Sequence, residues 1–254
     1  MTAEFQGPRS AIVTGGAKRI GAAISRALAE DGWHVLIHCH DSEDEARSLA
    51  AELGQATVVA ADLARSDAAA TIIAALDGLP PPRLLVNNAS RFVYDAADDF
   101  TLDLWDMHQA VNLRAPALLS QAFAAKAGQG GGLIVNLLDA KLAQPNPDFF
   151  SYTVSKIGLA GLTELLARVY AARGIRVCGI APSVTLVSGP QSRENFDQVH
   201  AMNALRRGVD VGEIVAALRF IVATPTYTGQ TITLDGGQRF LGLPRDVQFL
   251  EPEA

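Results

Sequence analysis

Cysteine is scarce in this sequence, and its scarcity bears on both disulfide and metal chemistry. Two cysteines occur among 254 residues. Cys39 and Cys178 lie far apart in the sequence, each inside a short apolar run with the composition of a strand, and such positions suit buried, reduced thiols. We therefore expect neither a disulfide nor a metal site.

Long apolar runs and an excess of basic residues are also lacking. No segment approaches the roughly 20 uninterrupted apolar residues of a membrane helix, and the N-terminal residues lack the apolar stretch of a signal peptide. Lys and Arg number 21 against 27 Asp and Glu, giving a net charge of −6, whereas surfaces that bind nucleic acid are basic. We therefore expect a cytoplasmic protein that binds neither membranes nor nucleic acid.

The sequence does contain short apolar runs that alternate with segments of helical period. The runs are rich in Val, Ile and Leu, as parallel strands buried on both faces are, and predict strands at 11–14, 35–38, 57–60, 84–87, 133–138, 176–180 and 231–234. Helices are expected at 21–31, 103–126 and 149–173. This alternation predicts one Rossmann-type α/β domain over residues 1–254, a doubly wound sheet of about seven parallel strands with helices on both faces. The polar segment 185–203 interrupts the alternation and is expected to form a substrate lid.

A glycine-rich turn follows the first expected strand directly. Residues 14–21 read Thr-Gly-Gly-Ala-Lys-Arg-Ile-Gly, and an expected helix begins at once. Glycines let the backbone approach a pyrophosphate closely, and the free N–H groups at a helix N-terminus attract its charge. The turn therefore predicts a dinucleotide site, although strand-to-helix turns also need glycine for steric reasons alone.

The end of the second expected strand bears on which nicotinamide cofactor would bind. An NAD enzyme places Asp or Glu there to accept hydrogen bonds from the ribose hydroxyls, and that position falls on Cys39. His40 and Ser42 could donate hydrogen bonds to a 2′-phosphate, whereas Asp41 would repel it unless the side chain points away. We therefore expect NADPH rather than NADH.

Tyr152 and Lys156 form a Tyr-x-x-x-Lys pair within an expected helix. A spacing of four puts the phenol and the ammonium on one helix face, and a nearby cation is expected to lower the tyrosine pKa from about 10 toward neutrality. The strand before this helix ends at Asp139. A carboxylate there would repel a developing oxyanion, but it suits an acidic ring N–H or a proton relay through Tyr152.

These motifs occur in the order typical of the short-chain dehydrogenase/reductase family, which the sequence resembles over residues 10–238. Four residues depart from that family's usual pattern. Arg19 replaces a glycine of the TGxxxGxG turn, Ser90 replaces the glycine of NNAG, Phe92 follows two residues later, and Asp139 replaces a serine. All four departures are similar to the pteridine reductases, whose TGxAKRxG and NASxF motifs recur here, and to the dihydromonapterin reductases, although Asp41 replaces an Arg of the former.

The resemblance implies a role for each matching residue. Cofactor contacts are expected at Gly15, Lys18, Arg19, Ile20, Gly21, His40, Ser42, Asp62, Leu63, Asn88, Ala89, Ser90, Tyr152, Lys156, Pro182 and Ser183. Catalytic residues would be Asp139, Tyr152, Lys156 and Asn112, the last holding a water on a proton path to the lysine. Substrate contacts would come from Arg19, Ser90, Phe92, Asp139 and Tyr152.

The resemblance implies an NADPH-dependent reductase of a dihydropterin, dihydromonapterin or dihydrofolate, assembled as a homotetramer. Two other functions stay open. One is a generic carbonyl reductase, for example of 3-oxoacyl thioesters, in which Asp139 would be a tolerated exception. The other is an NADP(H)-binding sensor without catalysis, although the combination of Tyr152, Lys156 and Asn112 is not one that packing alone requires.

Overall fold

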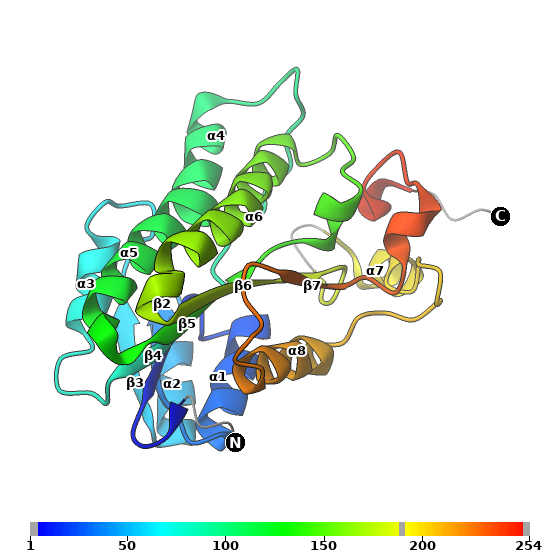
Figure 1. The fold of residues 1–254 in the computed structure, drawn as a ribbon. Coiled ribbons are helices and arrows are strands. Elements are labelled where there is room, and N and C mark those ends of the chain that lie inside the picture. Colours follow the sequence, from blue (N-terminus) through cyan, green and yellow to red (C-terminus); the bar gives the residue numbers. More distant parts are fainter. Residues whose placement is uncertain (1–4, 188–190, 251–254) are drawn as a thin grey trace.

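A parallel seven-stranded sheet runs through the centre of the protein (Figure 1), whose computed structural model describes residues 5–187 and 191–250. The strand order is β3-β2-β1-β4-β5-β6-β7, and every pairing is parallel. The strands are β1 (Ser10–Val13), β2 (His34–Cys39), β3 (Ala56–Ala60), β4 (Pro82–Asn87), β5 (Gly132–Leu137), β6 (Ile175–Pro182) and β7 (Thr231–Leu234). The Rossmann-type fold and all seven expected strands are confirmed, with strand ends shifted by a residue or two.

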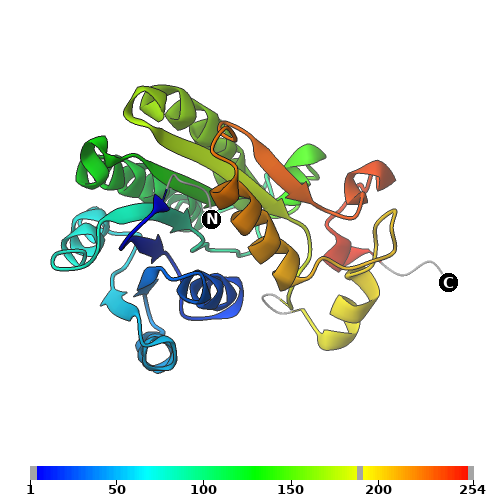
Figure 2. The same ribbon diagram turned by 60° about the horizontal axis from the view of Figure 1, so that its bottom comes forward.

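Helices cover both faces of the sheet (Figures 1 and 2). One face carries α1 (Arg19–Glu30), α2 (Glu43–Leu53) and α8 (Val211–Ala223), and the other carries α3 (Ala68–Ala74), α4 (Leu102–Gln109), α5 (Ala115–Ala127) and α6 (Phe150–Tyr170). Successive strand residues point to opposite faces. Ala11 and Val13 accordingly pack in the core under α1, whereas Ile12 packs under α5. Because both faces are buried, the central strands are apolar at nearly every position.

The helix expected at residues 103–126 is interrupted, which corrects the sequence-based prediction. The chain forms α4, then a π-helical turn η2 (Ala110–Arg114), then α5. Such turns widen a helix locally and are frequent at functional sites. Helical periodicity cannot reveal this turn, because Asn112 lies within it and is held by partners from elsewhere in the chain.

The segment expected to be a lid contains a short helix, α7 (Arg193–Val199), capped by the Ser192 side chain, which accepts a hydrogen bond from Asn195 N. Residues 188–190 of the expected lid lie outside the described residues. Its role as a lid therefore stays a prediction. Within residues 5–187 and 191–250, every helix is too short or too polar to cross a bilayer.

Candidate active site

The carboxyl ends of the central strands open into a cleft of about 1090 Å³. This edge of a doubly wound sheet is where nucleotides bind, because loops from several strands converge there. The cleft is lined by all the residues that the sequence resemblance singled out except Asn112. Turns far apart in the sequence thus share one cavity.

The turn between β1 and α1 is packed so tightly that it requires glycine. Gly15 has a φ of +59°, and a Cβ added at Gly21 would lie 2.0 Å from the carbonyl oxygen of Gly15. A side chain at Gly15 would be strained by this φ, and one at Gly21 would force the backbone to shift. The Asn88 side chain braces the turn by donating hydrogen bonds to Thr14 O (2.8 Å) and Gly15 O (3.1 Å).

His38 also holds this turn, a role that sequence reasoning missed. Its Nδ1 accepts a hydrogen bond from Gly15 N (3.1 Å), and its Nε2 donates to Ala61 O (2.9 Å). A backbone N–H can only donate, so Nδ1 carries no proton and the imidazole is neutral. Burial lowers the pKa of His38, which favours this neutral form. In the sequence this histidine was indistinguishable from an ordinary core residue of β2.

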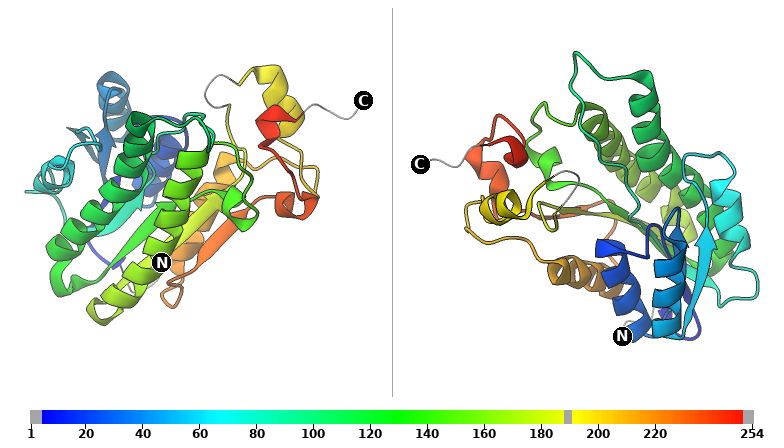
Figure 3. Two further views of the ribbon diagram at one scale, coloured as in Figure 1. Left: turned by 90° about the horizontal axis from the view of Figure 1, so that it is seen from above. Right: turned by 180° about the vertical axis from the view of Figure 1, so that it is seen from behind.

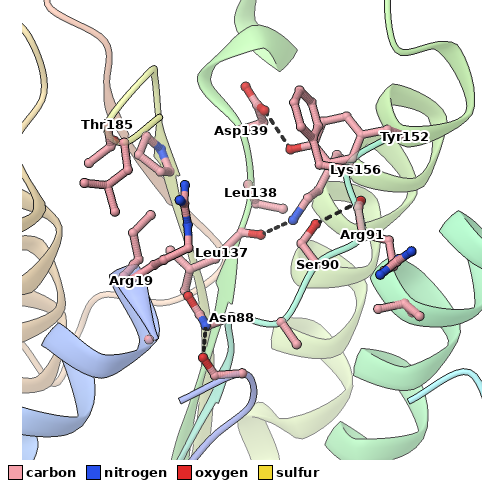
Figure 4. Close-up of a pocket in the computed structure, with 18 of the residues that line it drawn as sticks. Arg19, Asn88, Ser90, Arg91, Leu137, Leu138, Asp139, Tyr152, Lys156 and Thr185 are labelled. Atoms are coloured by element: carbon pink, nitrogen blue, oxygen red, sulfur yellow. Dashed lines mark hydrogen bonds between the residues drawn. The ribbon is translucent and has the colours of Figure 1, made fainter. Parts of the chain in front are cut away.

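Arg19 begins α1 in a conformation that normally belongs to glycine. Its φ is +55°, and a non-glycine residue in this region costs about 1 kcal/mol or more. Its guanidinium Nη1 donates a hydrogen bond to Val187 O (2.6 Å) at the mouth of the cleft. Figure 4 shows the Arg19 side chain extending from α1 toward Thr185, across the pocket from Tyr152 and Lys156.

The far end of the cleft carries the residues expected to face an adenosine ribose. His40 Nδ1 lies 3.3 Å from Asp41 Oδ2, and Lys18 Nζ lies 2.5 Å from Glu45 Oε1. Asp41 thus points toward His40 within this pair. Both side chains are at least partly exposed, so each can donate a hydrogen bond to a phosphate with little desolvation. This end of the cleft therefore offers one cation, Lys18, and one imidazole, His40, beside its acidic residues.

Asp139, Tyr152 and Lys156 meet where β5 ends beside α6 (Figure 4). The Tyr152 hydroxyl donates to Asp139 Oδ2 (2.7 Å), and Asp139 Oδ1 accepts from Lys141 N (2.8 Å). Lys156 Nζ donates to the Leu137 carbonyl (2.7 Å) and lies 5.7 Å from the centroid of the Tyr152 ring. The backbone therefore fixes the carboxylate and the ammonium on which any proton transfer by Tyr152 depends.

The expectation that Lys156 lowers the pKa of Tyr152 is wrong for this structure. Burial, followed by the charge and the hydrogen bond of Asp139, raises the pKa of Tyr152 well above its usual value near 10. Burial also lowers the pKa of Lys156 to about 8. The phenol consequently keeps its proton at neutral pH and is available as a proton donor rather than as a base.

Asn112 lies behind this trio, with its side chain committed to protein partners. Its Oδ1 accepts hydrogen bonds from Arg91 N (2.8 Å) and Ser90 Oγ (3.2 Å), and its Nδ2 donates to Arg91 O (2.9 Å) and Ser155 Oγ (3.0 Å). An amide makes about four such bonds, so a water on a relay would have to bind the backbone here. That expected water stays a prediction.

The stacked rings of Phe92 and Phe149 form an aromatic wall beside Asp139, Tyr152 and Lys156. The Phe92 ring stacks on Phe149 at 4.2 Å between centroids and meets Tyr152 edge-on at 4.7 Å. Such contacts hold rings at defined angles. Phe92 also lines the cleft.

A cluster of ion pairs that sequence reasoning missed lies beside Lys141 and Asp246, which line the cleft. The Arg245 guanidinium pairs with Asp148 (Nη2 to Oδ1, 2.7 Å), Asp246 N donates to Asp148 Oδ2 (2.7 Å), and Lys141 Nζ lies 3.7 Å from Asp246 Oδ2. Burial raises the pKa of the Asp246 carboxyl. No local signal could have placed these residues together, because nearly one hundred positions separate Asp148 from Arg245.

Comparisons with known proteins agree with this geometry. Residues 9–198 match the family model described as short chain dehydrogenase. The crystal structure of FolM Alternative dihydrofolate reductase 1 from Brucella canis complexed with NADP is 39% identical, with a TM-score of 0.89 over 94% of this chain and 97% of that one. The corresponding protein from Brucella suis is 40% identical, with a TM-score of 0.87 over 92% and 95% of the chains.

Sequence relatives include proteins with other activities. The Probable galactose dehydrogenase GalD of Rhizobium meliloti (strain 1021) is 33% identical over 90% of this chain and 94% of that protein. A 3-oxoacyl-[acyl-carrier-protein] reductase of Synechocystis sp. is 29% identical over 89% of this chain and 95% of that protein. The matched family model, the parallel sheet and the Tyr152–Lys156 site all agree, and the chain belongs to the short-chain dehydrogenase/reductase family of oxidoreductases.

Proposed function

We propose that this protein is an NADPH-dependent reductase of a pteridine-type substrate, such as a dihydropterin, dihydromonapterin or dihydrofolate. The observation that carries the proposal is the hydrogen bond from Tyr152 to Asp139 inside the cleft. A hydroxyl at residue 139 could donate to a substrate carbonyl, whereas the carboxylate can only accept unless it is itself protonated. The site therefore favours a substrate that presents N–H groups or takes a proton on nitrogen.

The residues of the cleft fit a nicotinamide dinucleotide. The glycine turn between β1 and α1 lines the cleft directly before the N-terminus of α1, where free N–H groups would attract a pyrophosphate. His40, Ser42 and Lys18 would face the adenosine end, where no carboxylate occupies the usual NAD position at Cys39. Bound reduced nicotinamide would supply a hydride. The two Brucella neighbours, whose structures contain NADP, support the choice of the phosphorylated cofactor.

Reduction of a C=N bond requires a proton at nitrogen as well as a hydride at carbon. Tyr152 is protonated at neutral pH because burial and Asp139 raise its pKa, so it can deliver that proton. As the phenol loses it, Lys156 would stabilise the resulting negative charge. Asp139 would hold the phenol in place and accept an N–H of the ring, and Arg19 and Phe92 would enclose the ring from two sides.

A carbonyl reductase is the second candidate, favoured by the 3-oxoacyl-[acyl-carrier-protein] reductase relatives. In that reaction negative charge develops on oxygen beside residue 139 in the transition state. An Asp139 carboxylate would repel this charge. The Brucella neighbours named as dihydrofolate reductases have the higher identity to this chain.

The test is NADPH oxidation by the purified protein with dihydrobiopterin, dihydromonapterin or dihydrofolate, compared with acetoacetyl thioesters. We expect turnover of at least one pteridine. Turnover of thioesters alone would replace the proposal by the second candidate. NADPH binding without turnover of any substrate would instead support the cofactor-binding sensor.

We also propose a cytoplasmic homotetramer. Leu165 and Val169 on α6 are 62% and 65% exposed, and Ile157 on the same helix is 50% exposed. Exposed apolar side chains that recur on one helix are typical of subunit interfaces. Sedimentation equilibrium of the wild type and of Leu165→Glu would test this, with loss of tetramers expected for the variant; a monomeric wild type would contradict the proposal.

A further inference from the structure

A buried polar chain of three side chains lies immediately beside Tyr152 and takes no part in the proposed chemistry. It consists of Asp95, Ser151 and His108, which are 4%, 0% and 0% exposed. Asp95 belongs to the segment after β4, His108 to α4 and Ser151 to the first turn of α6. The three side chains therefore join three separate elements around the active site.

The direction of each proton in this chain follows from the donors. Val93 N can only donate, so His108 Nε2 (3.3 Å) is the acceptor and Nδ1 must carry the proton of the neutral ring. Nδ1 then donates to Ser151 Oγ (2.6 Å), and the Ser151 hydroxyl donates to Asp95 Oδ2. The chain runs in one direction and ends on a carboxylate.

These directions distinguish the trio from a hydrolytic triad, which uses the same residue types. A nucleophilic serine gives its proton to the histidine, and the histidine gives its own to the aspartate. Here Ser151 gives its proton to Asp95, and His108 is a donor to the serine. The trio is also buried outside the cleft lining, so it holds structure rather than attacking a substrate.

The trio determines where α6 begins. Asp95 accepts the Ser151 backbone N–H through Oδ1 (3.0 Å), and Asp95 O accepts Phe150 N (3.1 Å). A carboxylate at a helix N-terminus satisfies free N–H groups and interacts favourably with the helix dipole. Phe149, directly before α6, has a φ of +53°, a conformation that persists only where its surroundings enforce it.

We propose that His108, acting through Ser151 and Asp95, is a positioning residue for the Tyr152 proton donor. Ser151 directly precedes Tyr152, and the His108 and Tyr152 rings lie 6.1 Å apart between centroids. Val93, which His108 anchors, directly follows Phe92 of the aromatic wall. The trio thus fixes the position of the Tyr152 phenol, which donates to Asp139, and of the Phe92 ring, which packs against that phenol.

The arrangement requires a neutral histidine. A protonated His108 would carry hydrogens on both nitrogens, and the one on Nε2 would face the Val93 N–H. The charged groups around the ring are Asp95 and Arg91, both from the segment after β4, while Tyr152 faces it from α6. Burial lowers the pKa of His108, Asp95 opposes this effect and Arg91 adds to it. Acid should therefore release Tyr152 from its position.

Ser151→Ala is the first test, because it removes one buried hydroxyl without changing the size of the core appreciably. We expect kcat to fall on the order of tenfold, since small misplacements of a reacting group are costly, while the Kd for NADPH stays unchanged. The matched control is Ser120→Ala on α5, since Ser120 is equally buried and its hydroxyl has no hydrogen-bond partner in the described part of the chain. The control should retain the kcat of the wild type.

His108→Asn provides a second readout, because its amide can replace the Nδ1–H donor but does not titrate. The acid limb of the kcat profile should move to lower pH in this variant, an effect that loss of stability alone would not produce. Wild-type kcat in Ser151→Ala, or an unshifted acid limb in His108→Asn, would overturn the inference.

The inference depends on the proposed function only in that Tyr152 is taken as the acid. The variants are compared on whichever substrate the wild type reduces, so a wrong choice of pteridine leaves the ranking of their kcat values unchanged. If the wild type reduces none, a crystal structure of Ser151→Ala decides: an Asp139–Tyr152 hydrogen bond unchanged within about 0.5 Å would overturn the inference.

Discussion

Tyr152 donates a hydrogen bond to the Asp139 carboxylate, whereas the Lys156 ammonium donates to a backbone carbonyl. The near neighbour of the phenol is thus an anion in a buried site, where charges interact more strongly than in water. The pKa of Tyr152 therefore rises. The pKa of Lys156 falls to about 8, because that ammonium is itself buried. The phenol therefore keeps its proton at neutral pH.

Replacing Asp139 by Asn should remove the charge while keeping the shape of the side chain. We expect kcat for the pteridine to fall by about 10² to 10⁴, the usual contribution of a positioned acid–base group, with the Kd for NADPH unchanged. Steady-state kinetics and a fluorescence titration would measure the two constants. Asp67→Asn, at an exposed carboxylate that pairs with Arg65, is the control. Undiminished turnover in Asp139→Asn would refute the assigned role.

Arg19→Gly should separate the effect of backbone strain on stability from the effect of the guanidinium on substrate binding. Glycine adopts a φ of +55° freely, so the free energy of unfolding should rise by about 1 kcal/mol, whereas the exposed hydrogen bond to Val187 contributes little. The KM for the pteridine should increase because the guanidinium is lost. Urea denaturation and kinetics would check both. A less stable variant would mean that Arg19 is not strained.

The turn between β1 and α1 depends on β2 and β4 as much as on its own glycines. His38 on β2 holds Gly15 N, and Asn88 after β4 holds the carbonyls of Thr14 and Gly15. Parallel pairing of β1 with both neighbours brings these side chains to the turn. The conformation of the glycine turn is therefore a property of three adjacent strand ends.

Acid should destabilise the protein through His38. The unfolded chain takes up a proton at this residue near pH 6.5, while burial keeps the folded residue neutral to lower pH. Unfolding therefore binds a proton, and the free energy of unfolding falls as the pH drops below 6.5. Chemical denaturation at pH 7.5 and near pH 5.5 should show a larger loss in the wild type than in His38→Gln. Equal losses would rule out a contribution from His38.

The C-terminal segment 242–250 folds back to line one end of the cleft. Figure 3 shows this segment beside α7 and near the turn that follows β5. Arg245 and Asp246 bind Asp148 just before α6, and Leu243, Asp246, Val247 and Gln248 line the cleft. This wall of the cleft is thus formed late in the sequence, whereas the turn expected to hold the cofactor follows the first strand.

Arg245→Gln should weaken the binding of substrate and leave the binding of cofactor unchanged. Asp148 is 4% exposed at its side chain, so losing its cation weakens the attachment of the segment. We expect the KM for the pteridine to rise on the order of tenfold, equivalent to about 1.4 kcal/mol, while the Kd for NADPH stays constant. The control is Arg219→Gln, whose ion pairs with Glu30 and Asp31 lie away from the cleft. Equal weakening of both ligands would contradict this division.

Local pattern was sufficient to predict the sheet, the glycine turn and the three residues Asp139, Tyr152 and Lys156 that meet in the cleft. Strands buried on both faces must be apolar throughout, and a turn that admits a pyrophosphate must contain glycine. Each can therefore be recognised from a short stretch of consecutive residues. The Tyr152 to Lys156 spacing is likewise short enough for one helix to set. These features depend on neighbours a few residues away.

Four features emerged only from the folded chain: the π-helical turn at Asn112, the brace at His38, the His108–Ser151–Asp95 trio and the Arg245–Asp148 clasp. Each joins residues from separate elements, and the sequence alone does not indicate which distant residues come into contact. The pKa of Tyr152 belongs to the same group. Its direction depends on burial and on the distance to each charge, and both exist only once the strands and helices have packed.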